Sequence, residues 1–125
     1  MGASESINRA LNTFFNSFGI PAYLEDNIGP GAVLPYLTYQ PVIPGGWNES
    51  SGFHARLWYP SSGGRVPILQ TEDAISAAIA DGLTIECEGG AIVLRTGSPW
   101  AQPLDNPPES YLCEYLNFEI TRLIP

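Results

Sequence analysis

His54 is the only histidine in the 125-residue chain, so a serine or cysteine nucleophile would depend on it as the base. It lies in the run Phe53–Tyr59, where apolar and polar residues alternate as in a half-buried strand. A histidine in such a strand is more often solvated or hydrogen-bonded within its own sheet than catalytic. The chain also lacks the G-x-S-x-G turn that exposes a nucleophilic serine. We therefore predict that the protein is not an enzyme.

Two carboxylates, Glu86 and Glu88, are spaced to lie on one face of a strand end, where a pair could act as acid and base. Alternating carboxylates beside a hairpin turn are usually only solvated, and oxygen-ligated metal sites need several converging ligands. Three glycine pairs stand in predicted turns without the lysine of a phosphate-binding loop. These pairs are Gly45-Gly46, Gly63-Gly64 and Gly89-Gly90. We therefore expect no metal and no other cofactor.

The two cysteines, Cys87 and Cys113, do not make a zinc site even with His54 beside them, because structural zinc takes four ligands. A disulfide would require their Cα atoms to lie within ~7 Å, which the sequence does not determine. We expect two buried thiols that pack as small apolar groups, and whether they pair stays open.

Acidic residues dominate the charge of the chain. Asp and Glu number 13 against five Lys and Arg, which gives a formal net charge of −8, and every basic residue is an arginine. Such a surface repels phosphate backbones, so we expect no tight binding to nucleic acid. No apolar run approaches the ~20 residues of a membrane-spanning helix. The length is typical of one domain of ~100–150 residues, so we expect a single domain over residues 1–125 and no association with a membrane.

Two helices are expected, each from an apolar stripe of helical period. The first covers about residues 7–18, and Ser4 or Ser6 is placed to cap it. Its stripe consists of Ile7, Leu11, Phe14, Phe15 and Phe18. The second helix is expected over residues 72–80, with Thr71 as its cap.

Five strands are expected, over residues 36–42, 53–59, 83–87, 91–95 and 111–124. Residues 20–35 and 97–110 are rich in proline and glycine, so we expect an irregular crossing in the first segment and a stiffened arm in the second. Strands that meet in neighbouring hairpins imply antiparallel pairing. The predicted fold is α+β, with an antiparallel or mixed β-sheet of about five strands and two helices packed on one face.

The last expected strand is apolar on both faces, which is more than a half-exposed strand needs. Its second face carries Tyr111 and Tyr115, so we expect that face to be covered by another chain. Trp47 and Trp100 stand in loops of proline, glycine and polar residues, and tryptophan and tyrosine are enriched where one protein packs on another. These four residues are predicted to form an interface, although Trp58 and Tyr115 fit a core position equally well.

Five short motifs stand along the chain: Ile20–Asp26 (IPAYLED), Leu34–Tyr39 (LPYLTY), Leu57–Tyr59 (LWY), Gly89–Ile92 (GGAI) and Gly97–Gln102 (GSPWAQ). Together they resemble the tail terminator or tail completion proteins of long-tailed bacteriophages, and the resemblance covers about residues 7–116. In that family an α+β subunit assembles as a hexameric ring on the finished tail tube. The ring stops growth of the tube and provides the surface that joins the connector of the DNA-filled head.

The resemblance implies a structural virion protein of the tail or neck, assembled in the host cytoplasm. Its partners would be further copies of itself, the major tail tube protein and a head–tail connector or stopper protein. Leu34–Tyr39 and Gly97–Gln102 would then carry contacts to other subunits or to the tube. Arg56 and Arg95, both expected on strands, would bridge subunits, because a planar guanidinium fits a protein carboxylate.

DNA would pass through the channel of such a ring without specific binding, and the chain supplies no lysine to hold it. We expect the channel wall to carry Asp81, Glu86 and Glu88, which cluster near one end of the hairpin expected at the centre of the sheet.

Two other functions stay open. The protein could be another neck component, such as a head-closure or adaptor ring, because the L-P-Y-x-T-Y element also occurs in such proteins. It could instead be a small-molecule-binding domain or an enzyme that uses a cleft near His54 and Glu86.

Overall fold

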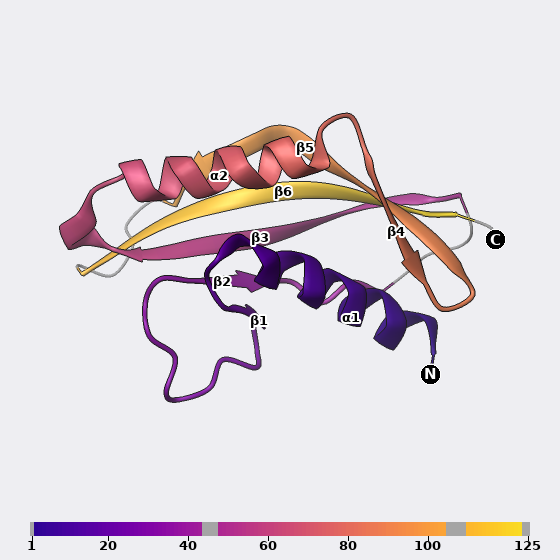
Figure 1. The fold of residues 1–125 in the computed structure, drawn as a ribbon, viewed down its shortest axis with the longest axis horizontal. Coiled ribbons are helices and arrows are strands. Elements are labelled where there is room, and N and C mark those ends of the chain that lie inside the picture. Colours follow the sequence, from indigo (N-terminus) through magenta and orange to yellow (C-terminus); the bar gives the residue numbers. More distant parts are fainter. Residues whose placement is uncertain (1, 44–47, 105–109, 124–125) are drawn as a thin grey trace.

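The computed structural model describes residues 2–43, 48–104 and 110–123. It confirms the predicted α+β fold, with two α-helices and a curled, mixed sheet of six strands rather than about five (Figure 1). The helical elements are α1 (Ala3–Phe15), η1 (Asn16–Phe18), η2 (Ser61–Gly63) and α2 (Val66–Ile79). The strands are β1 (Ala22–Leu24), β2 (Tyr36–Tyr39), β3 (Ser50–Pro60), β4 (Leu83–Cys87), β5 (Gly90–Pro103) and β6 (Tyr111–Leu123). Within the described ranges no helix is long and apolar enough to span a membrane.

The sheet has the strand order β1-β2-β3-β6-β5-β4. β1 runs parallel to β2, and every other neighbouring pair is antiparallel. The long central ladder joins β3 to β6, with Phe53 opposite Phe118 and Trp58 opposite Cys113. The hairpin of β4 and β5 therefore lies at one edge of the sheet, which corrects the expectation of a central hairpin.

Both helices pack on one face of the sheet. Phe15 of α1 is fully buried, and its ring centroid lies 5.1 Å from that of Tyr39, 6.4 Å from that of Phe53 and 5.4 Å from that of Phe118. The same core takes Ile68, Ile75 and Ile79 from α2 and alternate residues from the strands, among them Ala55, Leu57, Tyr59, Ile92, Leu94, Leu116 and Ile120. Both helices therefore pack their buried sides against this one face of the sheet.

Helix α2 begins at Val66, so the expected start at residue 72 is wrong. Pro67 lies in its first turn, where a missing N–H costs no helical hydrogen bond. Thr71 is therefore inside the helix, where its hydroxyl contacts that of Tyr59 rather than capping the end. Helix α1 begins after Gly2 without a side-chain cap, because Ser4 and Ser6, the expected caps, both lie inside the helix. The Ser6 hydroxyl accepts a hydrogen bond from the Glu88 N–H (2.8 Å).

The stretch Gly97–Pro103 belongs to β5, so the expected stiffened arm is wrong there. The ladder with β6 shifts register between Thr96 and Ala101, and this bulge takes up the extra residues of β5. β1 lies inside the segment expected to be irregular.

Two carboxyl groups are buried between α2 and the sheet. Glu114 of β6 accepts a hydrogen bond from Arg65 Nη1 at 2.8 Å, and Glu72 of α2 is 7% exposed. Burial, together with the neighbouring Glu114, raises the pKa of Glu72 to about 8. The Glu72 carboxyl is therefore largely protonated at neutral pH.

Candidate functional site

The face of the sheet opposite the helices, which we call the open face, is not covered by any helix of the described chain. Side chains alternate along a strand, so the neighbours of core residues point to this face. Five aromatic side chains gather there from four strands, and all are half-buried. This aromatic patch consists of Tyr23 (β1), Tyr36 (β2), Trp58 (β3), Tyr111 and Tyr115 (both β6).

The rings of the aromatic patch pack edge to face in pairs. The ring centroids of Tyr23 and Tyr36 lie 5.9 Å apart, and those of Trp58 and Tyr111 lie 6.1 Å apart. The indole N–H of Trp58 donates a hydrogen bond to the Thr38 hydroxyl at 3.0 Å. These contacts hold the rings in fixed positions and leave part of each ring exposed. Rigid, partly exposed aromatic rings favour the binding of a partner protein.

Arg56 lies beside the aromatic patch on β3. Its guanidinium carbon is 4.9 Å from the ring centroid of Tyr115, a cation–π contact. Its Nε atom is buried and has no hydrogen-bond partner among the residues that the structure describes. The open face therefore presents an arginine whose hydrogen-bonding capacity is only partly used.

Cys113 lies on the open face opposite Trp58 and is fully buried, which raises the pKa of its thiol to about 12. Burial also raises the pKa of the half-buried Cys87. Both cysteines are free. The expectation of two thiols packed as apolar groups is confirmed for Cys113 and holds in part for Cys87. Neither thiol is activated as a nucleophile.

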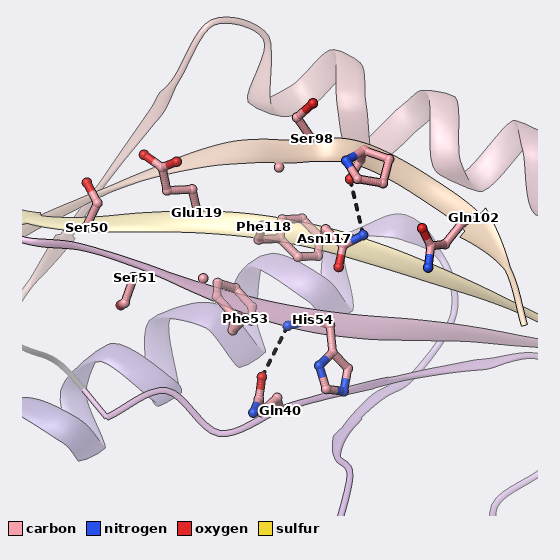
Figure 2. Close-up of a pocket in the computed structure, with 13 residues that line it drawn as sticks. Gln40, Ser50, Ser51, Phe53, His54, Ser98, Gln102, Asn117, Phe118 and Glu119 are labelled. Atoms are coloured by element: carbon pink, nitrogen blue, oxygen red, sulfur yellow. Dashed lines mark hydrogen bonds between the residues drawn. The ribbon is translucent and has the colours of Figure 1, made fainter.

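A polar hollow of about 630 Å³ adjoins the bulge of β5, on the open face (Figure 2). It is lined chiefly by amide and hydroxyl side chains, among them Gln40, Ser51, Gln102 and Asn117. Asn117 donates a hydrogen bond from Nδ2 to the Pro99 carbonyl at 3.1 Å and so fixes the bulge. His54 and Glu119 are the two residues with an imidazole or carboxyl side chain among those that line this hollow.

His54 makes no catalytic arrangement. Its Nε2 atom lies 3.5 Å from Glu25 Oε2, a charge contact only when the imidazole is protonated. Its main-chain N–H donates to Gln40 Oε1 at 3.3 Å, and its ring lies edge-on to that of Tyr115 with centroids 5.6 Å apart. The part of the chain that the structure covers holds no group of three or more potential metal ligands.

The structure brings together Arg56, Tyr111 and Tyr115 of the predicted interface on one face. Trp100, in contrast, packs edge-on against Phe118, with centroids 5.2 Å apart, at the margin of the core. The expectation that Trp100 stands away from its own core is therefore wrong, because β5 continues through this residue. Trp47 lies outside the described residues. Arg95 is exposed on β5 opposite Glu119 of β6, away from Arg56.

The three predicted channel carboxylates do not form one cluster. Asp81 precedes β4 and Glu88 follows it, so these two residues lie at opposite ends of that strand. Glu86 is exposed near the Glu88 end. β4 is an edge strand, and two strands, β5 and β6, lie between it and β3, which carries His54. The structure therefore forms no cleft between His54 and Glu86.

Tyr23 of the aromatic patch was not predicted as a site residue, and Tyr36 was predicted only as part of the contact segment Leu34–Tyr39. The motifs IPAYLED and LPYLTY contain them, but strand pairing sets their places. The antiparallel register of β2 with β3 puts Tyr36 opposite Trp58, and the parallel register of β1 with β2 pairs Tyr23 with Thr38. Hydrophobic periodicity could not reveal this pairing, because β1 spans only three residues.

Comparison with known proteins identifies no family. No family model matches the sequence. No curated protein matches it either. One solved structure, whose name describes no function, has a TM-score of 0.62 and 14% sequence identity over 99% of both chains. At that identity the likeness concerns the fold alone, so the chain shares its whole architecture with a protein of known structure.

Proposed function

We propose that the protein is a structural subunit that assembles with itself into a ring, and that this ring caps the tail tube of a long-tailed bacteriophage. The observation that carries the proposal is the open face, where the aromatic patch and Arg56 lie uncovered by any helix of the described chain. Tyrosine, tryptophan and arginine are the residues that most often dominate the energy of protein interfaces. A ring subunit needs such a surface and needs no catalytic groups.

The resemblance of the five motifs to those of tail terminator proteins supports the viral part of the proposal. LPYLTY supplies Tyr36 and Thr38 to the open face, and GSPWAQ forms the bulge of β5 and part of the hollow beside it. In the proposed role the ring ends growth of the tail tube and provides the surface for the head connector. DNA would cross the ring without being held, because the chain has a formal net charge of −8.

The mass of the purified protein in solution, measured by light scattering with and without tail tubes, tests the proposal. A hexamer would have six times the 13.5 kDa mass of the monomer. Negative-stain images should show rings at one end of the tubes. The variant Tyr111→Ser should lose the ring, whereas Arg9→Ser, on the exposed side of α1, should keep it. Protein that stays monomeric under both conditions would refute the proposal.

The alternative role as another neck component uses the same face but a different partner. A pull-down with purified tail tubes and, separately, with head connectors distinguishes the two roles. Binding to the connector alone would favour a head-closure or adaptor ring.

A small-molecule-binding role is favoured only by the hollow beside the β5 bulge. Its volume of about 630 Å³ falls within the range of ligand pockets, ~300–1,000 Å³. A thermal-shift survey of small polar ligands checks this role, and a reproducible rise in Tm that is lost in Asn117→Ala would favour it.

A further inference from the structure

The exposed side of α2 is largely apolar. Val66 is 63% exposed and Leu69 is 46% exposed, and three alanines continue the same side toward the end of the helix: Ala74, Ala77 and Ala78. Gln70 is exposed on the same side, and Asp73 is the one charged side chain that α2 exposes, because Glu72 is turned into the core. We call this surface, Val66, Leu69, Gln70, Asp73, Ala74, Ala77 and Ala78, the outer side of α2.

Helix α1 provides an internal comparison, because it packs on the same face of the sheet. Its exposed side is polar and carries Ser4, Glu5, Arg9 and Thr13. Glu5 and Arg9 form an i,i+4 ion pair at 3.3 Å, as on an ordinary solvated helix. A solvated helix is expected to be polar on its outer side, so the apolar outer side of α2 indicates a surface that another molecule covers.

We infer that the outer side of α2 receives the aromatic patch of a second copy of this chain, so that Asp73 of one copy faces Arg56 of the next. The inference rests on the proposed function, because it names the second surface that a ring of identical subunits requires. The two surfaces lie on opposite sides of the same sheet, since α2 covers the core face and the aromatic patch belongs to the open face. They cannot meet within one chain. They can meet only head to tail between copies, which is the kind of contact that builds rings.

Shape favours this pairing. The side chains at positions 74, 77 and 78 are alanine methyl groups, which are short, so large aromatic rings can approach the helix backbone closely there. The rings of the aromatic patch are held by their mutual contacts and by the hydrogen bond from Trp58 to Thr38. A rigid aromatic surface against a low apolar helix loses little conformational entropy on binding.

Charge also favours a second copy as the occupant. With 13 acidic and five basic residues, most pairs of surfaces on two copies repel each other. Arg56 on the open face and Asp73 on the outer side of α2 are opposite in sign. Arg56 is half-buried, so a carboxylate brought to the accessible part of its guanidinium would form a charge-assisted ion pair.

Charge reversal tests the pairing in the full chain. Asp73→Arg and Arg56→Asp should each raise the dissociation constant of assembly ~10-fold or more, because each places like charges together. The double variant Asp73→Arg/Arg56→Asp should regain assembly. An equimolar mixture of the two single variants should also assemble, since each supplies the surface that the other lacks. Glu5→Arg on α1 is the matched control and should assemble as the wild type does.

Thermal melting of each variant first establishes that the fold is kept, and sedimentation then gives the mass. A folded Asp73→Arg variant that assembles like the wild type would overturn this inference while leaving the proposed ring intact, provided Tyr111→Ser still abolishes assembly. Failure of both the double variant and the mixture to assemble would overturn the Asp73–Arg56 pairing. A wild type that is monomeric in every condition would overturn the proposed function together with the inference.

Discussion

Asn8 of α1 binds both main-chain groups of Val42, much as a neighbouring strand would. Its Nδ2 atom donates to the Val42 carbonyl at 2.6 Å, and its Oδ1 atom accepts from the Val42 N–H at 2.9 Å. One turn further along α1, Asn12 donates to the Tyr39 hydroxyl and to the Ala22 carbonyl. Asn16, the first residue of η1, accepts from the Ala22 N–H. These asparagine side chains thus form hydrogen bonds with backbone groups of Ala22 and Val42 that would otherwise lack partners at the β1 edge of the sheet.

Asn8→Ala should lower the free energy of unfolding by about 1–3 kcal/mol, because it leaves two half-buried backbone groups of Val42 without partners. Denaturation by urea measures the loss. Ser4→Ala, at an exposed position of the same helix, is the control and should change stability by no more than ~0.5 kcal/mol. Equal stability of the two variants would contradict the role assigned to Asn8.

Glu72→Gln should stabilise the protein at pH 8.5 and have little effect at pH 5. The pKa of Glu72 is raised from 4.5 to about 8 by burial and by Glu114, so the folded state holds a proton that the unfolded chain releases. Its stabilising contribution is full below the unfolded pKa and is lost as the pH rises through about 8. The amide keeps the neutral form at every pH.

Thermal melts of wild type and Glu72→Gln from pH 5 to pH 8.5 check this prediction. The difference in stability should grow with pH toward the order of 2–4 kcal/mol. Gln70→Ala, at an exposed uncharged position of the same helix, is the control, and its difference from the wild type should not change with pH. A constant difference across the range would show that Glu72 is not the titrating group.

Gly97→Ala should destabilise the fold by about 1–3 kcal/mol. A Cβ atom at this position would lie 3.0 Å from Asn117 Cβ and 3.1 Å from the Asn117 carbonyl carbon and oxygen, and two of these atoms are backbone. Gly31→Ala, where nothing lies within 4 Å, is the matched control. Circular dichroism melts of both variants provide the comparison. If Gly97→Ala leaves the stability unchanged, the backbone of the β5 bulge can shift to make room for the added methyl group.

Trp100→Ala should lower Tm as well as any affinity for a partner, because the indole packs against Phe118 at the margin of the core. Truncation of a half-buried tryptophan should cost about 2–4 kcal/mol. Melting of the purified variant at a concentration low enough to keep it monomeric isolates the contribution of the fold. If Tm is unchanged in the monomeric variant, Trp100 contributes to an interface and not to the stability of the fold.

The elements predicted well are those whose pattern is local. The helical stripe around Leu11 and Phe15 and the alternation around Phe53 and Tyr59 each needed only a few neighbouring residues, and both segments are buried as their patterns indicated. β1 escaped prediction because three residues carry no periodicity, and its place depends on pairing with β2. The early start of α2 and the length of β5 were missed because prolines stand in both. A first-turn position and a bulge tolerate proline, and neither can be recognised before the register is known.

The open face was only partly predictable for the same reason. The alternation within β6 indicated that Tyr111 and Tyr115 share a face, and this stands in the structure. That Arg56 lies opposite Tyr115, and that Tyr36 lies opposite Trp58, depends on which residues pair across strands. Sequence periodicity within one strand contains no information about its neighbour. The apolar outer side of α2 was missed because the predicted helix began after Val66 and Leu69.

The position of β6 between β3 and β5 has a consequence for synthesis of the chain on the ribosome. Residues up to 60 build one flank of the sheet, and residues 83–103 build the other flank. Neither flank pairs with the other until residues 111–123 have emerged to join them. Until then each flank presents an unpaired strand edge, which is a hazard for aggregation in nascent chains. Pairing across the whole sheet is thus expected only after residues 111–123 have emerged, and a holdase chaperone would gain its access to the chain in that interval.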